Sequence, residues 1–366
     1  MPRTNHWLLR GLRHVDGILL LLLVLVLGIS LAVVTSASGQ SPARISGHLV
    51  NMGLALAVML LMANVPPHLL SKAGPPLYAA GLVLLLGVAL FGEIRNGARR
   101  WLDLGFMAFQ PSELLKLALP LMLAWYFQRN EAVLRAKHFL VGGALLLVPF
   151  LLVLRQPDLG TALMLGASGF YLLFFAGLPW KVMFGGAALG AASLPVVWGL
   201  LHDYQQRRVL TLLDPTSDPL GDGYHIIQST IAIGSGGLFG KGWTQGTQNQ
   251  LDFIPERTTD FIFAVFGEEF GYIGAILLVA LYLAIVARGL TIAARAPTQF
   301  GRLMAATLSL NLFTYVFVNM GMVSGILPVV GVPLPLMSYG GTALITLLLG
   351  MGILMSVATH RQLNKS

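Results

Sequence analysis

The sequence predicts an all-α polytopic membrane protein with about ten transmembrane helices. Of its 366 residues, 56% are hydrophobic and only 10% are charged, against roughly 25% charged residues in an average soluble domain. Stretches of about 20 apolar residues, the length that crosses a hydrocarbon core about 30 Å thick, recur along almost the whole chain. These observations favour a single membrane domain over residues 1–366 rather than several soluble domains.

The apolar stretches define the expected helices in order. The first follows a basic start and precedes small residues, as in a signal peptide, but its apolar run is longer than a usual signal core, which favours a retained helix. The ten expected spans are about 17–36, 47–64, 76–92, 112–127, 138–154, 158–176, 180–201, 259–286, 303–323 and 337–358. The one long connection, about 202–258, lies between spans seven and eight, and a loop of that length predicts a functional segment.

Charge predicts the orientation of these helices. Ten spans place both termini on one side, and a cytoplasmic amino terminus puts thirteen of the 23 Lys and Arg residues inside and ten outside, in the direction of the positive-inside rule. Of the 15 acidic residues, only Asp16 and Glu131 fall inside, so polar chemistry is expected at the outer face. The net charge of +8 is spread thinly, without the basic stripe of a nucleic-acid-binding protein. The absence of cysteine excludes disulfides and thiolate chemistry.

Three acids are expected at the same membrane face. Glu113 opens span four, Asp158 opens span six and Asp260 opens span eight, and even-numbered spans all run from outside to inside. The alternative is ordinary helix-start chemistry, in which a proline and an acid occupy the first turn. Both interpretations stay open for each acid.

Further charges inside the spans need partners. Glu113 and Lys116 are three residues apart and share a helix face, so they are expected to pair, either for structure or for function. Glu268 and Glu269 cannot both face lipid, which predicts a polar cavity or a buried partner such as a helix-end amide.

Two glycine- and proline-containing segments interrupt the apolar pattern. Residues 235–242 lack the leading glycine and the closing Ser or Thr of a phosphate loop; they form either a tight turn or a backbone nest that binds pyrophosphate with Lys241. Prolines prevent residues 325–336 from forming one continuous helix. Irregular backbone at membrane depth must be covered by protein or line a cavity, so this segment, flanked by Asn319, Ser324, Ser338 and Tyr339, is expected to form a cavity wall.

Several motifs together resemble the shape, elongation, division and sporulation (SEDS) family over essentially the full chain, and its rod-shape branch more than its division branch. The motifs are Arg100-Trp101-Leu102-Asp103, Gln110-Pro111-Ser112-Glu113, Gln156-Pro157-Asp158-Leu159-Gly160-Thr161, Asp214-Pro215, Gly223-Tyr224-His225, Gly242-Trp243, Gln248, Phe253-Ile254-Pro255-Glu256, Thr259-Asp260-Phe261-Ile262-Phe263-Ala264-Val265, Gly267-Glu268-Glu269, Pro333-Leu334-Pro335 and Ser338-Tyr339-Gly340-Gly341.

The resemblance implies a peptidoglycan glycosyltransferase that uses lipid II in a bacterial cytoplasmic membrane during cell elongation and rod-shape maintenance. It also implies a class B penicillin-binding protein as the transpeptidase partner, with other membrane proteins of the elongation machinery, and no organic cofactor. The essential acid of the family falls on Asp260, and its other functional positions fall on Trp101, Glu113, Lys116 and Asp158.

The chemistry of this reaction suggests roles for these side chains. Forming a β-linked glycan from an α-linked lipid pyrophosphate inverts the anomeric carbon, which needs a base, and Asp260 is the hypothesis for that base. Positive charge would stabilise the leaving group; the candidates are Lys116, Arg207, Arg208, Lys241, or a divalent ion such as Mg²⁺ or Mn²⁺ held by Glu113, Asp158 and Asp260. The alternatives are a lipid II flippase, which needs a polar path reaching both faces, and a scaffold without catalytic carboxylates.

Overall fold

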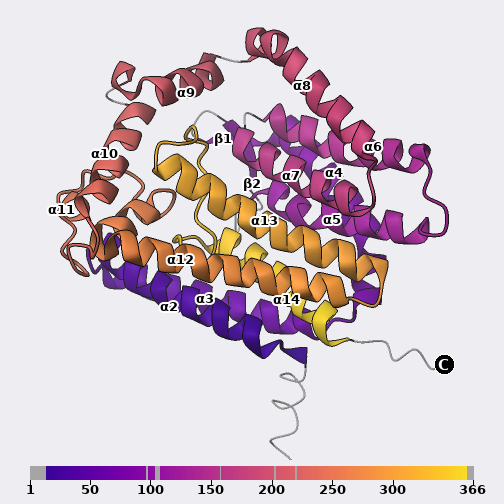
Figure 1. The fold of residues 1–366 in the computed structure, drawn as a ribbon, viewed down its shortest axis with the longest axis horizontal. Coiled ribbons are helices and arrows are strands. Elements are labelled where there is room, and N and C mark those ends of the chain that lie inside the picture. Colours follow the sequence, from indigo (N-terminus) through magenta and orange to yellow (C-terminus); the bar gives the residue numbers. More distant parts are fainter. Residues whose placement is uncertain are drawn as a thin grey trace, which may run out of the picture.

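The computed structural model describes residues 14–95, 98–103, 108–156, 158–201, 203–218 and 221–360. Ten long helices lie at the expected places (Figure 1): α2 (Gly17–Ala37), α3 (Pro42–Ala63), α4 (Pro67–Phe91), α5 (Pro111–Arg129), α6 (Ala136–Leu154), α7 (Leu159–Phe175), α8 (Trp180–Leu200), α12 (Ile262–Arg295), α13 (Gln299–Val323) and α14 (Gly341–Thr359). Among the described residues, seven helices are long and apolar enough to cross a membrane, and α7 is a shorter apolar helix. The all-α polytopic fold is confirmed, and the count of ten crossings stays a prediction.

A few residues with predicted roles lie outside the described part of the chain. They are five of the thirteen basic residues counted on the inner side, namely Arg3, Arg10, Arg13, Arg361 and Lys365, together with Pro157 of the motif before α7 and His202 at the start of the long connection.

Several helix starts differ from the prediction by three to five residues, and that of α4 differs by nine; two of them matter for the fold and the site. The third helix begins at Pro67 and runs through Pro75 and Pro76, so the expected start at residue 76 was wrong; the proline at its first helical position is Pro67, where the missing N–H costs nothing. The eighth begins at Ile262 rather than residue 259. Asp260 therefore lies in the turn before α12 and not in its first helical turn.

The long connection between α8 and α12 is largely helical. It contains α9 (Asp203–Leu213), a 3-10 turn (Pro215–Ser217), α10 (Asp222–Ser235) and α11 (Thr247–Gln250), which form an arc at one end of the molecule in Figure 1. A small antiparallel sheet of β1 (Glu93–Arg95), β2 (Ala98–Asp103) and β3 (Ala108–Phe109) joins α4 to α5. This sheet is the one departure from the expected all-helical elements among the described residues.

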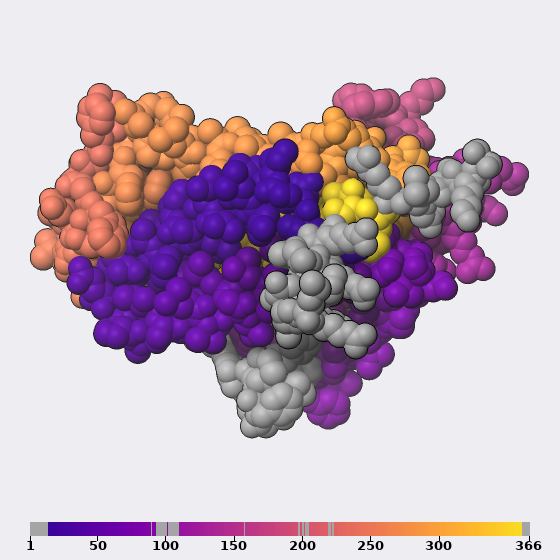
Figure 2. All heavy atoms as spheres, turned by 90° about the horizontal axis from the view of Figure 1, so that it is seen from below, coloured from indigo at the N-terminus to yellow at the C-terminus, as the bar shows by residue number. Residues whose placement is uncertain are grey.

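The long helices pack around two apolar cores that share α13 and α14. The first core is built from α2, α3 and α12 with parts of α13 and α14, and Figure 2 shows α2 and α3 side by side along one face, below α12. The second core joins α4, α5 and α7 to the other parts of α13 and α14. Most side chains of α8 are exposed, in contrast with those of α5 and α13.

Helix α12 is broken at Gly271, whose φ of 67° and ψ of −167° are not helical. The carbonyl oxygens of Glu268 and Glu269 at the break accept hydrogen bonds from the backbone N–H groups of Lys241 and Gly242, at 3.0 and 3.1 Å. Residues 237–242 thus satisfy backbone groups that the break exposes, as membrane-depth backbone requires. This supports a tight structural turn over a pyrophosphate nest, because these amides are already used.

Candidate functional site

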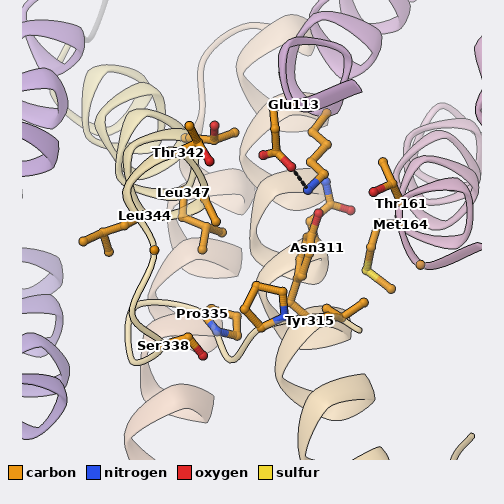
Figure 3. Close-up of a pocket in the computed structure, with 18 of the residues that line it drawn as sticks. Glu113, Thr161, Met164, Asn311, Tyr315, Pro335, Ser338, Thr342, Leu344 and Leu347 are labelled. Atoms are coloured by element: carbon orange, nitrogen blue, oxygen red, sulfur yellow. Dashed lines mark hydrogen bonds and ion pairs between the residues drawn. The ribbon is translucent and has the colours of Figure 1, made fainter. Parts of the chain in front are cut away.

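A cavity of about 310 Å³ lies among the first turns of α5 and α7, the middle of α13, residues 331–340 and the start of α14. Four of the predicted site residues line this cavity: Trp101, Glu113, Lys116 and Asp158. Figure 3 shows the cavity with Glu113, Thr161, Tyr315 and Thr342 directed toward its interior from four different helices. These residues are separated by up to 57 positions in the sequence, and the fold brings them to one cavity.

Glu113 and Lys116 form an ion pair on the cavity wall. The Lys116 Nζ donates to the Glu113 Oε1 at 2.5 Å, and the two side chains are 18% and 14% exposed. The ammonium group also lies 5.5 Å from the centre of the Tyr315 ring, an arrangement that favours a cation. The second carboxylate oxygen, Glu113 Oε2, is buried and accepts no hydrogen bond from the described residues. The two charges of the pair thus stabilise each other, while one carboxylate oxygen has no hydrogen-bond partner among the described residues.

Asp158 performs ordinary helix-start chemistry. It is the N-cap of α7, where its Oδ1 accepts a hydrogen bond from the Thr161 backbone N–H at 3.1 Å. Its Oδ2 accepts one from the Gln110 side-chain amide at 3.2 Å. Both oxygens are therefore engaged in fixing the entrances of α5 and α7, which is the role of an N-cap residue.

Asp260 differs from the other two acids. Its carboxylate makes no hydrogen bond to a described residue, and it caps no helix. It does not line the cavity itself but lies behind Gly331, which does: a Cβ atom added at Gly331 would be 3.5 Å from the Asp260 Oδ2. Burial, together with the nearby Glu256 carboxylate, raises the pKa of Asp260 from its ordinary value of 3.8 to about 6, because both disfavour the charged form.

The cavity wall is fastened to the segment that carries Asp260. The Asn319 side-chain amide donates to the carbonyl oxygens of both Asp260 and Val332, each at 2.7 Å. The Ser338 hydroxyl donates to the Thr259 carbonyl oxygen at 2.6 Å. Residues 324–340 between α13 and α14 are irregular and supply cavity-lining residues, so the expected proline-interrupted wall is confirmed by the geometry.

The other predicted cations lie elsewhere. Arg207 and Arg208 are on α9 and do not line the cavity. Lys241 is ion-paired with Glu268 at 2.7 Å. Glu268 also accepts the backbone N–H groups of Gln248 and Asn249 at 2.9 and 3.3 Å, so the expected helix-end amide partner is present at α11. Lys241 belongs to this buried structural network.

The comparison with known proteins identifies the family. The sequence model of the FtsW/RodA/SpoVE family, whose description is "Cell cycle protein", matches residues 13–363. The chain belongs to the FtsW/RodA/SpoVE family. It is 53% identical over 351 residues to "Peptidoglycan glycosyltransferase MrdB" of Escherichia coli (strain K12), covering 96% of this chain and 95% of that protein. It is 38% identical over 315 residues to "Probable peptidoglycan glycosyltransferase FtsW" of Geobacter metallireducens, covering 84% and 82%.

Solved structures of FtsW/RodA/SpoVE proteins share the fold. A chain from a peptidoglycan synthase complex, described as coordinating polymerization and crosslinking, superposes with a TM-score of 0.80 at 36% identity over 94% of this chain and 97% of that chain. The rod shape determining protein RodA of Thermus thermophilus gives a TM-score of 0.73 at 32% identity over 95% and 98%. The resemblance read from the motifs is thereby confirmed.

The carboxylates of this FtsW/RodA/SpoVE protein do not fit a shared metal site. The described residues include no group of three His, Cys, Asp or Glu side chains that could hold a metal ion. Glu113 is paired with Lys116, and both oxygens of Asp158 accept protein hydrogen bonds. The oxygens without a protein donor are Glu113 Oε2 and those of Asp260, but Asp260 does not line the cavity that contains Glu113, so we derive no step through a metal.

Sequence reasoning missed two polar residues of the cavity in this family member. Asn311 and Tyr315 line it from α13, and the Asn311 side-chain amide donates to the Ser168 hydroxyl at 3.0 Å. With Asn319 they form a series of polar residues spaced by four along a largely apolar helix. Side chains at that spacing share one helix face, so a polar stripe was the signal that could have located the cavity side of α13.

Proposed function

We propose that the chain is a peptidoglycan glycosyltransferase that polymerises lipid II into glycan strands during cell elongation. In this proposal it acts at the outer face of a bacterial cytoplasmic membrane, with both termini in the cytoplasm. The single observation that carries the proposal is Asp260: a carboxylate beside the cavity wall, without a hydrogen-bond partner among the described residues and with a pKa near 6. A base works best when its pKa lies close to the working pH. The names of the relatives support the same activity.

The reaction requires one proton transfer and one substitution at carbon. The Asp260 carboxylate takes the proton of the acceptor hydroxyl, and the hydroxyl oxygen forms the new bond to the anomeric carbon of the donor. The bond from that carbon to the lipid pyrophosphate breaks, and the pyrophosphate leaves with the electron pair. Attack opposite the leaving group inverts the configuration, as in inverting glycoside chemistry.

The cavity supplies the remaining roles. Lys116 is the cation that lines the cavity, and Glu113 and Tyr315 hold it in place; we assign it to the developing negative charge of the leaving group, because fixed charges of this kind often contribute most to catalysis. Asp158 keeps the entrances of α5 and α7 together, and Trp101 contributes an aromatic surface to the cavity lining. Arg207, Arg208 and Lys241 are not assigned to this step.

The flippase alternative is less favoured by the packing. A flippase needs a polar path that reaches both faces of the membrane. Along α5, α13 and α14, the cavity is followed by fully buried apolar side chains, among them Leu119, Leu123, Met304 and Ile353. This apolar layer closes the cavity on one side, as a polymerase with a single reacting face requires.

A partner with transpeptidase activity is part of the proposal. The structural relative with a TM-score of 0.80 comes from a peptidoglycan synthase complex that coordinates polymerization and crosslinking. We infer that the present chain works beside a class B penicillin-binding protein in the same way, together with other membrane proteins of cell elongation.

The test compares Asp260→Asn with Asp252→Asn in purified, reconstituted protein. Asp252 is a largely exposed acid of the same connection, paired with Arg257, and serves as the matched control. Labelled lipid II is incubated with each protein, with and without the penicillin-binding partner, and the products are separated by size. Removing a general base should lower the rate by roughly 10²–10⁴-fold, whereas the control should polymerise normally.

Two outcomes would contradict the proposal. If Asp260→Asn made long glycan strands at the normal rate, Asp260 would not be the general base. Intact precursor transported across vesicles by the wild-type protein, without strands, would support the flippase.

A further inference from the structure

A second cavity, of about 870 Å³, lies at the opposite end of three helices that also line the first. The first cavity uses Glu113 of α5, whereas the second uses Arg129, and sixteen residues of α-helix separate them by about 24 Å. Helix α13 contributes its middle to the first cavity and its amino-terminal end to the second, and α14 contributes its first half to the first cavity and its carboxyl-terminal end to the second. The apolar layer described above lies between the two cavities. The second cavity is therefore a separate site, which the glycosyltransferase reaction does not use.

The charged and titratable side chains that line the second cavity are all basic. Lys72 of α4 and Arg129 of α5 line it together with His14, His68 and His360, and no carboxylate is among its described lining residues. Neither Lys72 nor Arg129 forms an ion pair with a described residue, whereas Lys116 of the first cavity is neutralised by Glu113. Positive charge without a counter-ion at the end of a helix bundle favours an anion.

The two acids expected on this face are already neutralised. Asp16 is bound by two nitrogens of Arg288, at 3.1 and 2.5 Å. Glu131 is 3.7 Å from Arg302. Because these acids have their own arginine partners, they leave the charge of Lys72 and Arg129 uncompensated.

Aromatic rings hold the basic side chains of the cavity in place. The Arg129 guanidinium lies 5.5 Å from the centre of the Trp125 ring, and this contact limits the positions of a side chain that would otherwise be mobile. The His14 and His360 rings are stacked, with centres 3.9 Å apart and planes within 6°. His360 Nδ1 lies 3.1 Å from the Ser356 carbonyl oxygen, and His14 Nδ1 lies 3.3 Å from the Thr359 hydroxyl. Hydrogen bonds to α14 thus hold both imidazoles at the cavity.

We propose that this second cavity binds a phosphate-bearing anion. The ligand phosphate lies between Lys72 and Arg129, which supply an ammonium point charge and a planar guanidinium fork. The volume lies within the range of small-molecule sites, and basic pockets between transmembrane helices at the cytoplasmic side bind phosphate head groups of lipids. The phosphate belongs either to an anionic lipid head group or to a soluble ligand, and the experiment separates these two sources.

The experiment measures binding of two probes to the full chain in a zwitterionic detergent. Cardiolipin is counted on the protein by native mass spectrometry, and inorganic pyrophosphate is measured by equilibrium dialysis. The test variant is Lys72→Gln/Arg129→Gln. The matched control is Arg135→Gln/Lys137→Gln, which removes the same charge from exposed positions next to the start of α6, outside the cavity lining.

At least one probe should bind the test variant about tenfold or more weakly than the wild type, because this variant removes the lysine and the arginine that line the cavity. The control should lose about twofold at most. Selective loss of cardiolipin identifies a lipid head group, and selective loss of pyrophosphate identifies a soluble ligand; both support the site. The proposal is overturned if the control variant loses as much affinity as the test variant, or if Lys72→Gln/Arg129→Gln binds both probes as tightly as the wild type does. If the double variant does not fold, Lys72→Gln is compared with Lys137→Gln in the same assays. Both lysines are exposed, so neither single substitution disturbs the core.

Discussion

The side-chain amide of Asn319 lies 2.7 Å from the backbone carbonyl oxygen of Asp260. The same nitrogen is 2.7 Å from the carbonyl oxygen of Val332, so one side chain joins the proposed base to the cavity wall. Asn319 is fully buried, and both contacts are made where α13 passes the two segments. The position of the Asp260 carboxylate relative to the cavity therefore depends on a residue that itself touches no substrate.

Asn319→Ala should lower the polymerisation rate more than it lowers substrate binding. Its loss leaves two carbonyl oxygens without a donor, at roughly 1–3 kcal/mol for a buried unsatisfied group. The matched variant is Asn311→Ala on the same helix, whose amide bonds to Ser168 and not to the Asp260 segment. We expect kcat to fall by about tenfold or more for Asn319→Ala with KM nearly unchanged. Equal effects of the two variants on kcat would argue against a positioning role.

The pH dependence of polymerisation should report the pKa of Asp260. A base must be deprotonated, and the pKa of this carboxyl is about 6 because burial and Glu256 disfavour its charge. Activity should thus be full above about pH 7 and should fall by about tenfold for each unit below pH 6. Glu256→Gln removes the neighbouring charge and should move the acid limb of kcat/KM to lower pH. An acid limb that does not move would assign the titration to another group.

The same pKa predicts an unusual stability effect. Since the folded pKa of about 6 exceeds the ordinary value of 3.8, the folded state binds this proton more tightly than the unfolded state. The stabilisation is complete below about pH 4 and is lost as pH rises through 6. Asp260→Asn should therefore be more stable than the wild type at pH 7.5, by on the order of 2–3 kcal/mol in the free energy of unfolding, and should melt at a higher temperature; near pH 4 the two proteins should melt at the same temperature. A lower melting temperature at pH 7.5 would show that the ionised carboxylate stabilises the fold.

The Glu113–Lys116 pair allows structure and function to be separated. Glu113→Gln or Lys116→Met alone leaves a mostly buried charge without its partner, and should cost up to about 3 kcal/mol in the free energy of unfolding. Glu113→Gln/Lys116→Met removes both charges and should recover most of the melting temperature. Polymerisation should remain low in the double variant, because Lys116 is the cation proposed for the leaving group. Recovery of activity together with stability would make the pair purely structural.

Gly271→Ala tests the break in α12. At φ of 67° and ψ of −167° a side chain is strained by about 1–3 kcal/mol, and its Cβ atom would lie 2.3 Å from the Gly240 backbone nitrogen. The melting temperature should therefore fall by several degrees. Gly28→Ala in α2 is the control, because a Cβ atom there meets nothing within 4 Å and alanine suits a helix better than glycine. If both variants melt like the wild type, the break is not fixed by the turn at Gly240.

The sequence located the helices because burial in lipid requires long apolar runs, and these are visible without any knowledge of packing. It misplaced the start of α4 because Pro75 and Pro76 resemble a helix start, while the chain uses Pro67 instead. The cluster of Glu113, Lys116 and Asp158 was predictable, since helices of one direction present their first turns at one face.

Other features of the site depended on contacts that sequence spacing does not contain. Lys241 meets Glu268 across 27 residues, so the spacing left both a substrate-binding and a structural role open, and the ion pair favours the structural one. Arg207 and Arg208 lie on α9, whose direction is set by the arc from α8 to α10. Glu113, Asp158 and Asp260 have the same relation to their helices in the sequence, and only their hydrogen bonds distinguish a capping residue, an ion-pair member and an unengaged carboxylate.

The layer of Leu119, Leu123, Met304 and Ile353 has a consequence for the energy supply of the cell. Hollows at both ends of a helix bundle invite water, and continuous files of water or titratable groups conduct protons through membranes. Here each hollow ends on hydrocarbon side chains. An enzyme built in this way can hold hydrophilic substrates in a cavity within the bilayer without letting protons leak across it, so the electrochemical gradient is not dissipated.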